Sequence, residues 1–207
     1  MQSNTAPTWA TSPELWVMFN PSAAFRSFML TGGGGRWLAF RRPLLLALVF
    51  GCVISLLTST QLIPGLVAGE SLSWSVVPFL QVISLAMLTW RRRPVLGLPR
   101  IIDLFFTGMG PWLLWLTGVA ALSSVSDWVD VQNWAGPSRV WLSLGSMLPA
   151  LIWSGWIDFY FFRRVMGESR SGAVRNLLLQ RLIASMSWFV LFYGYVVWPL
   201  LPWRLGR

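Results

Sequence analysis

Arginine is distributed along this chain in an alternating pattern, and this pattern constrains the fold more than any motif does. Five apolar stretches are separated by segments that are by turns rich in arginine and nearly free of it. Positively charged residues stay on the cytoplasmic side of a bilayer, so the alternation predicts five membrane spans with the N-terminus inside and the C-terminus outside. The arginine-rich segments contain Arg26, Arg36, Arg41 and Arg42, then Arg91, Arg92, Arg93 and Arg100, and finally Arg163, Arg164, Arg170, Arg175 and Arg181.

The predicted spans cover residues 43–63, 74–90, 101–122, 140–162 and 182–203. Each is close to the ~20 apolar residues that a helix needs to cross a hydrocarbon core about 30 Å thick. The connections assigned to the outer side carry acids instead of clustered arginines: Glu70 in one, Asp127 and Asp130 in the other. We therefore predict an all-α, polytopic membrane protein, with residues 1–42 as a cytoplasmic segment, 43–203 as the transmembrane domain and 204–207 as a tail.

The N-terminal segment has its own helix signals. Ser12-Pro13 predicts the start of a short helix that ends near residue 19, and Asn20-Pro21 predicts a second that ends near residue 30. Their apolar residues share a face at helical spacing, but the segment is too short and too polar to span a membrane. We expect an interfacial helix on the cytoplasmic surface. The alternative is a helix that packs against the protein's own spans.

The residue types that the chain lacks exclude whole classes of chemistry. It has no histidine and one cysteine, Cys52. Histidine ligands for haem or zinc, a histidine general base, an intramolecular disulfide and a thiolate metal cage are therefore excluded. The sequence also has no nucleophile elbow and no metalloprotease motif. We expect a protein that is not an enzyme and that binds no cofactor or metal.

The net charge of +9 could suggest a nucleic-acid partner. The arginines cluster at the ends of apolar spans, however, where each would meet anionic headgroups with a gain of about 1 kcal/mol. We expect membrane lipids and other integral membrane proteins as partners, and no nucleic acid. With 55% hydrophobic and 11% charged residues, the chain is expected to be a multi-pass protein of the bacterial cytoplasmic (inner) membrane.

Two acids within the predicted spans are candidate site residues. Asp103 follows Arg100 by one helical turn at a span edge, which predicts an interfacial ion pair. Asp158 lies about 7 Å inside the cytoplasmic edge at ~1.5 Å per residue, and its own helix offers no cation nearby. We expect an inter-helix salt bridge for Asp158. Its candidate partners are Arg91 to Arg93, Arg100 and Arg181, and the alternative is a proton or cation site.

Small residues recur at four-residue spacing in two spans, where they allow close approach between helices. Such a ridge can face another helix of the same chain or another subunit, and the sequence leaves this open. The predicted ridges are Gly51, Ser55 and Ser59 in the first span, and Ser146, Ala150 and Ser154 in the fourth.

The order of these features resembles the Yip family of five-span membrane proteins, which bind Rab/Ypt GTPases in eukaryotes and also occur in bacteria. The similar segments are Asn20-Pro21 through Phe25, the Arg41 to Pro43 start of the first span, and Ser169 to Leu179 before the last span. Asp103-Leu104-Phe105 followed by Gly110-Pro111-Trp112 is similar to the family's DLYGP motif, with residues inserted between the two halves. The resemblance implies a non-enzymatic membrane protein engaged in protein–protein contact or membrane organisation.

Two functions from different classes follow. The first is an accessory or scaffold protein that packs against partner membrane proteins; a subunit of a larger inner-membrane complex fits within this hypothesis. The second is a small transporter or channel that uses Asp158 and helices kinked by proline. The environment of Asp158 distinguishes them, because an arginine partner supports a scaffold and an open polar cavity supports transport.

Overall fold

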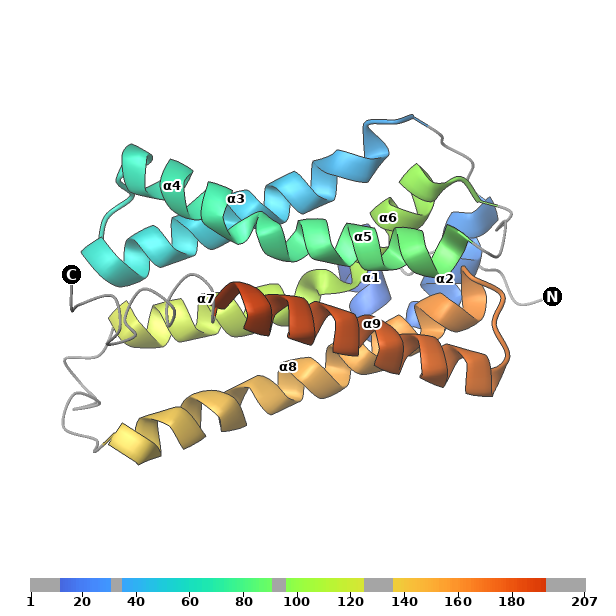
Figure 1. Cartoon of the computed structure of the whole chain (residues 1–207). Helices are drawn as coiled ribbons and strands as arrows, with labels where there is room; N and C mark the ends of the chain where they lie inside the picture. Colours follow the sequence, from blue (N-terminus) through green and yellow to red (C-terminus); the bar gives the residue numbers. More distant parts are fainter. Residues whose placement is uncertain (1–11, 31–34, 91–95, 125–135, 193–207) are drawn as a thin grey trace, which may run out of the picture.

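The computed structural model describes residues 12–30, 35–90, 96–124 and 136–192, and within these ranges the chain is helical with no strand. The all-α prediction is therefore confirmed for this part of the chain. The long helices lie side by side in an elongated bundle, and the short helices α1 and α2 lie at one end of it (Figure 1).

The N-terminal segment contains α1 (Pro13–Phe19) and α2 (Pro21–Leu30). The predicted caps are present: Ser12 Oγ accepts a hydrogen bond from the Leu15 amide at 3.2 Å, and Asn20 Oδ1 accepts one from the Ala23 amide at 3.2 Å. These side chains satisfy amide groups that the first turn of a helix leaves unpaired.

The two short helices pack against the rest of the protein. Val17 and Phe25 are completely buried, and the indole Nε1 of Trp153 in α8 donates a 2.8 Å hydrogen bond to the Met18 carbonyl. Between α2 and α8 the Phe25 and Phe161 rings lie 5.9 Å apart, and Arg164 Nε donates a 3.2 Å hydrogen bond to Ser22 Oγ. The alternative of packing against the protein's own helices therefore describes this segment, and its placement at the membrane interface stays a prediction.

The first long hairpin consists of α3 (Leu38–Ser59), α4 (Pro64–Trp74) and α5 (Val76–Trp90). The prediction of a connection at 64–73 before a span at 74–90 is wrong, because Pro64 begins a helix and Pro64–Trp90 is apolar enough to cross a membrane as a whole. Proline is well suited to the first helical position, and a single Glu70 does not interrupt the helix. In Figure 1, α4 and α5 follow one another in nearly the same direction.

The third apolar segment is broken. It consists of α6 (Leu98–Phe106), the 3₁₀ turn η1 (Thr107–Met109) and α7 (Gly110–Ser124). Pro111 has no amide to donate to the Thr107 carbonyl, and its ring would crowd that carbonyl in a regular α-helix. The tighter 3₁₀ turn immediately before Pro111 accommodates this conflict.

The last two helices are α8 (Gly136–Arg164) and α9 (Arg170–Phe192). The helix that contains the start of the predicted fifth span, at residue 182, begins earlier, at Arg170. Ser169 caps it, because its Oγ accepts a hydrogen bond from the Gly172 amide at 3.1 Å. The predicted end of this span, at residue 203, lies outside the described residues.

Three helical segments are long and apolar enough to cross a membrane: Leu38–Leu56, Pro64–Trp90 and Leu98–Ala121. They suggest a multi-pass membrane protein. That α8 and α9 also cross, and that the N-terminus is cytoplasmic, remain predictions.

The core lies where α1, α2, α6 and α8 meet. Phe161 of α8 is at its centre, with its ring 5.3 Å from Phe105 of α6 and 5.9 Å from Phe25 of α2, both in edge-to-face geometry. Ile157, one turn earlier in α8, is also fully buried, and its side chain contacts Gly108 of η1. This core fixes the end of the bundle where both candidate acids lie.

Candidate functional site

Asp103 lies in α6 with none of its side chain exposed. The guanidinium group of Arg41 in α3 donates two hydrogen bonds to the Asp103 carboxylate, from Nε to Oδ1 at 2.7 Å and from Nη2 to Oδ2 at 3.0 Å. Arg42 of the same helix forms a further ion pair with Oδ1 and donates a 3.1 Å hydrogen bond from Nη1 to the Asp103 carbonyl. Arg100, one turn before Asp103, contributes a longer bond of 3.3 Å to Oδ2.

The network extends from Asp103 to the N-terminal helices. Arg42 donates to Glu14 Oε1 of α1 through Nη2 at 2.8 Å and Nε at 3.1 Å. Arg100 Nη2 donates to the Phe28 carbonyl of α2 at 3.1 Å. We call Glu14, Arg41, Arg42, Arg100 and Asp103 the Asp103 cluster. It joins α1, α2, α3 and α6.

The geometry of the Asp103 cluster explains how a carboxylate can be buried. Taking a charge out of water costs several kcal/mol, and this is offset only when close counter-charges and additional hydrogen bonds are present. Asp103 has both, because the Arg41 contact is bidentate and the Arg42 contact lies on the same oxygen. Arg41 is 42% exposed, so its contribution is reduced by water, whereas Arg42 and Arg100 are mostly buried.

The second acid, Asp158 of α8, is 1% exposed and forms an ion pair with Arg181 of α9. The same Arg181 Nη2 also donates a 2.8 Å hydrogen bond to Ser154 Oγ, one turn before Asp158. Ser154 is itself completely buried. We call Asp158, Arg181 and Ser154 the Asp158 cluster. It joins α8 to α9.

The structure brings the predicted site residues together in two separate groups. Arg100 contacts Asp103, as predicted, and Arg181 contacts Asp158, whereas residues 91–93 lie outside the described chain. Asp103, which the sequence predicts in an ion pair at the edge of a span, is fully buried. Sequence reasoning missed Arg41 and Arg42 as its main partners. The signal that could have found them is that both stand at the start of the first predicted span, whose predicted cytoplasmic end lies on the same side of the membrane as Asp103.

The first small-residue ridge faces another helix of the same chain. A Cβ on Gly51 would lie 2.5 Å from the Val67 carbonyl oxygen of α4, so the two helices are in backbone contact there. Ser55 Oγ donates to the Gln61 carbonyl at 2.9 Å and accepts from the Ile63 amide at 3.1 Å, which closes the turn between α3 and α4. Ser59 Oγ also donates to the Gln61 carbonyl, at 2.8 Å.

The second ridge is likewise internal along most of its length. Ala150 and Ser154 are buried, and Ser146 Oγ accepts a 3.2 Å hydrogen bond from Trp115 Nε1 of α7. Both ridges therefore serve contacts between helices of this chain.

The two acidic groups are suited to holding helices together. Each carboxylate is already bound by arginine, and no group of three or more metal-ligating side chains occurs among the residues the structure describes. Two buried amide oxygens, Gln81 Oε1 and Gln180 Oε1, have no hydrogen-bond partner in the described part of the chain.

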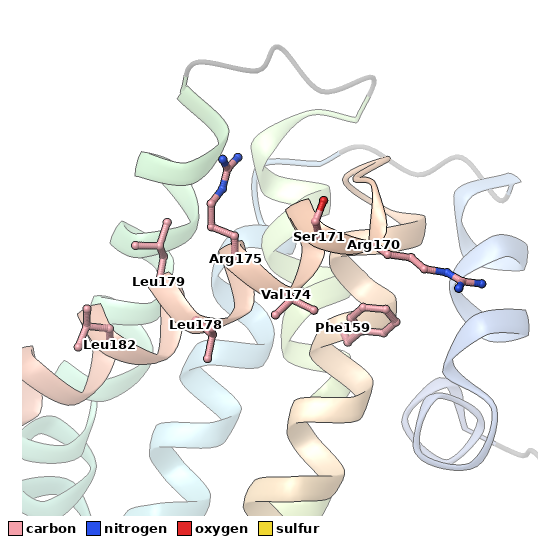
Figure 2. A pocket seen from close by; sticks show the side chains of 8 residues that line it. All are labelled: Phe159, Arg170, Ser171, Val174, Arg175, Leu178, Leu179 and Leu182. Carbon is pink, nitrogen blue, oxygen red and sulfur yellow. The ribbon is translucent and has the colours of Figure 1, made fainter.

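An open groove of about 670 Å³ lies on the outer surface of α9 beside the end of α8 (Figure 2). Its floor is apolar, and two arginines extend from it to either side. We call it the α9 groove, lined by Phe159, Arg170, Ser171, Val174, Arg175, Leu178, Leu179 and Leu182.

Comparison with protein-family models, with curated proteins and with solved structures found no match to this chain.

Proposed function

We propose that the chain is a non-enzymatic, five-span accessory or scaffold protein of the bacterial inner membrane that packs against partner membrane proteins. The observation that carries the proposal is the division of side chains between interior and surface. Both buried acids are neutralised by arginines of the same chain, while large apolar side chains face outward along the long helices. Polar contacts thus hold the bundle together, and apolar faces are available to lipid and to partner proteins.

Helix α9 has this division in its middle part, over residues 176–186. Its buried side includes the polar residues Asn176 and Gln180, while Leu178, Leu182 and Met186 are each more than half exposed. In water such a helix would expose the side that the hydrophobic effect should bury. In a bilayer the arrangement is favourable, since the apolar side chains meet lipid and the polar side chains are kept away from it inside the bundle.

The same outward apolar faces occur on α3 and α5. Leu44, Leu45 and Leu48 are exposed on α3, and Phe79 and Met87 are exposed on α5. Small-residue ridges, which could have mediated subunit contacts, are used within the chain. The proposed partner contacts therefore fall on these large apolar side chains.

The environment of Asp158 favours a scaffold over a transporter. A carboxylate that is 1% exposed and bound to a guanidinium group is poorly placed to exchange a proton or a cation with water. The α9 groove, moreover, is lined by other residues and opens on the outer surface. The resemblance to the Yip family supports the same role in protein–protein contact or membrane organisation.

The test is purification of the tagged chain from its native membrane in a mild detergent, followed by mass spectrometry of the proteins that co-purify. We expect other integral membrane proteins in a fixed ratio to the chain. A test variant replaces Leu44 and Leu48 with Asn. It should reduce the recovery of partner proteins without disturbing either buried acid. Recovery of the chain alone would contradict the proposal and make transport the leading hypothesis.

A further inference from the structure

We propose that the α9 groove binds one anionic phospholipid, with Arg170 and Arg175 attracting its headgroup from either side and an acyl chain lying along Val174, Leu178 and Leu182. This inference rests on the proposed placement of α9 in a membrane, and it is independent of whether the chain is a scaffold.

The order of residues along α9 matches the order of groups in a phospholipid. Arg170, Val174, Leu178 and Leu182 follow one another at four-residue spacing, so they lie on one ridge of the helix. The charged residue is at the start of the helix, on the predicted cytoplasmic side, and the apolar residues follow towards the predicted membrane interior. Ser171, Arg175 and Leu179 form a parallel ridge with the same order. A headgroup at the start of α9 would thus place its acyl chain on leucines.

The two groove arginines differ from those at the buried acids. Arg41, Arg42, Arg100 and Arg181 are each bound to a carboxylate, whereas Arg170 and Arg175 form no ion pair with an acid among the described residues. Both are exposed, and in Figure 2 their guanidinium groups extend to either side of the apolar floor formed by Val174 and Phe159. Two free cationic groups beside an apolar surface attract an anionic lipid more than a zwitterionic one.

The apolar floor continues beyond the groove. Met186 and Phe189 are exposed further along the same side of α9. From Val174 to Phe189 the helix rises by about 22 Å at ~1.5 Å per residue, which exceeds the ~15 Å half-thickness of a hydrocarbon core. An acyl chain therefore meets apolar side chains over its full length. A soluble phosphate or a short anionic molecule would leave this surface unused, so the structure favours a lipid.

The test uses the full-length protein in mixed detergent micelles, with lipid binding followed by native mass spectrometry. Phosphatidylglycerol is compared with phosphatidylcholine of the same acyl chains, and glycerol phosphate supplies the headgroup without a tail. We expect one tightly bound phosphatidylglycerol, several-fold weaker binding of phosphatidylcholine, and no competition by glycerol phosphate. Equal binding of the two lipids would contradict the proposal, because the groove would then contact lipid without selecting an anionic headgroup. Competition by glycerol phosphate would also contradict the proposal, because the groove would then bind a small anion without an acyl chain.

The variants separate charge from shape. The double substitution Arg170→Gln with Arg175→Gln should weaken phosphatidylglycerol binding by roughly tenfold, since each surface arginine contributes several-fold to attraction of an anionic lipid. The control Arg26→Gln with Arg36→Gln removes the same charge from exposed positions outside the groove and should change binding less than twofold.

Leu178→Asn tests the contact with the acyl chain. It should weaken the binding of phosphatidylglycerol and of phosphatidylcholine to the same extent. If the groove and control variants lose binding to the same extent, net charge alone attracts the lipid and the site is overturned. Failure of the lipid test leaves the co-purification result intact, so the two proposals can fail separately.

Discussion

Asp103 and Asp158 are both held by arginines from neighbouring helices, yet their surroundings differ. Asp103 is shared among three arginines, whereas Asp158 depends on Arg181 and the Ser154 hydroxyl group lies beside them. Removing one partner of a buried pair leaves an uncompensated charge, which costs more than the pair itself contributes. The two acids should therefore respond differently to the loss of a single arginine.

Arg181→Gln should lower the free energy of unfolding by about 3 kcal/mol, because it leaves the Asp158 carboxylate buried without a cation. The double variant Asp158→Asn with Arg181→Gln should recover most of this loss, since neither charge remains. Unfolding by denaturant in detergent micelles measures both. A double variant as unstable as Arg181→Gln alone would show that the two groups are not coupled in this way.

Arg100→Gln should be milder, at about 1 kcal/mol, because Arg41 and Arg42 still neutralise Asp103 and the lost bond is the longest of the group. Asp103→Asn should cost about 3 kcal/mol, since it removes the shared counter-charge of the cluster. Glu14→Gln is the matched control at the edge of the same network. Glu14 is 43% exposed, so its loss should cost less than about 1 kcal/mol. The same unfolding measurement would contradict this ranking if Glu14→Gln were the most destabilising of the three.

Among the elements, α3 and α4 approach each other closely at Gly51. Gly51 of α3 lies against the backbone of α4, where a Cβ would be 2.5 Å from the Val67 carbonyl oxygen and 2.9 Å from the Ser71 amide nitrogen. Backbone atoms cannot move aside as the end of a flexible side chain can. The helices must therefore separate to admit even a methyl group.

Gly51→Ala should destabilise the protein by about 1–3 kcal/mol, because overpacking at this contact outweighs the gain in helix propensity. Gly69→Ala is the control in the same hairpin, since nothing lies within 4 Å of its added Cβ. It should be neutral or stabilising by up to about 1 kcal/mol. Thermal unfolding of the two variants in detergent provides the comparison, and an unaffected Gly51→Ala protein would mean that the hairpin is looser than described.

At the scale of the whole molecule, the five-span topology makes a definite labelling prediction. In a Cys52→Ser background, Gly35→Cys and Ser171→Cys should react with a membrane-impermeant maleimide only after the cells are opened. Leu62→Cys and Asp130→Cys should react in intact spheroplasts. If Asp130→Cys and Ser171→Cys reacted on the same side, α8 would not cross the membrane and the chain would have fewer than five spans.

How far the sequence predicts this protein depends on the range of each interaction. The caps at Ser12 and Asn20 are present as predicted, because a cap involves residues three apart. The helical class also follows from local apolar runs. The predicted connection at 64–73 is wrong because charge patterning does not register a helix that Pro64 begins. Asp103 and Asp158 could be found from the sequence because acids within predicted spans are unusual. The sequence did not identify all of their partners, since Arg41 and Arg42 were missed.

The sequence by itself determined that the chain is helical and apolar enough for a membrane, since both properties are sums over neighbouring residues. Only the tertiary structure decided that Arg41 and Arg42 close around Asp103, at sequence separations of 62 and 61 residues. It also decided that one face of the N-terminal helices packs against other helices of the chain, where Val17 and Phe25 are buried. These contacts depend on which helices become neighbours, and that is set by packing around Phe161 and Gly51, which no local pattern encodes.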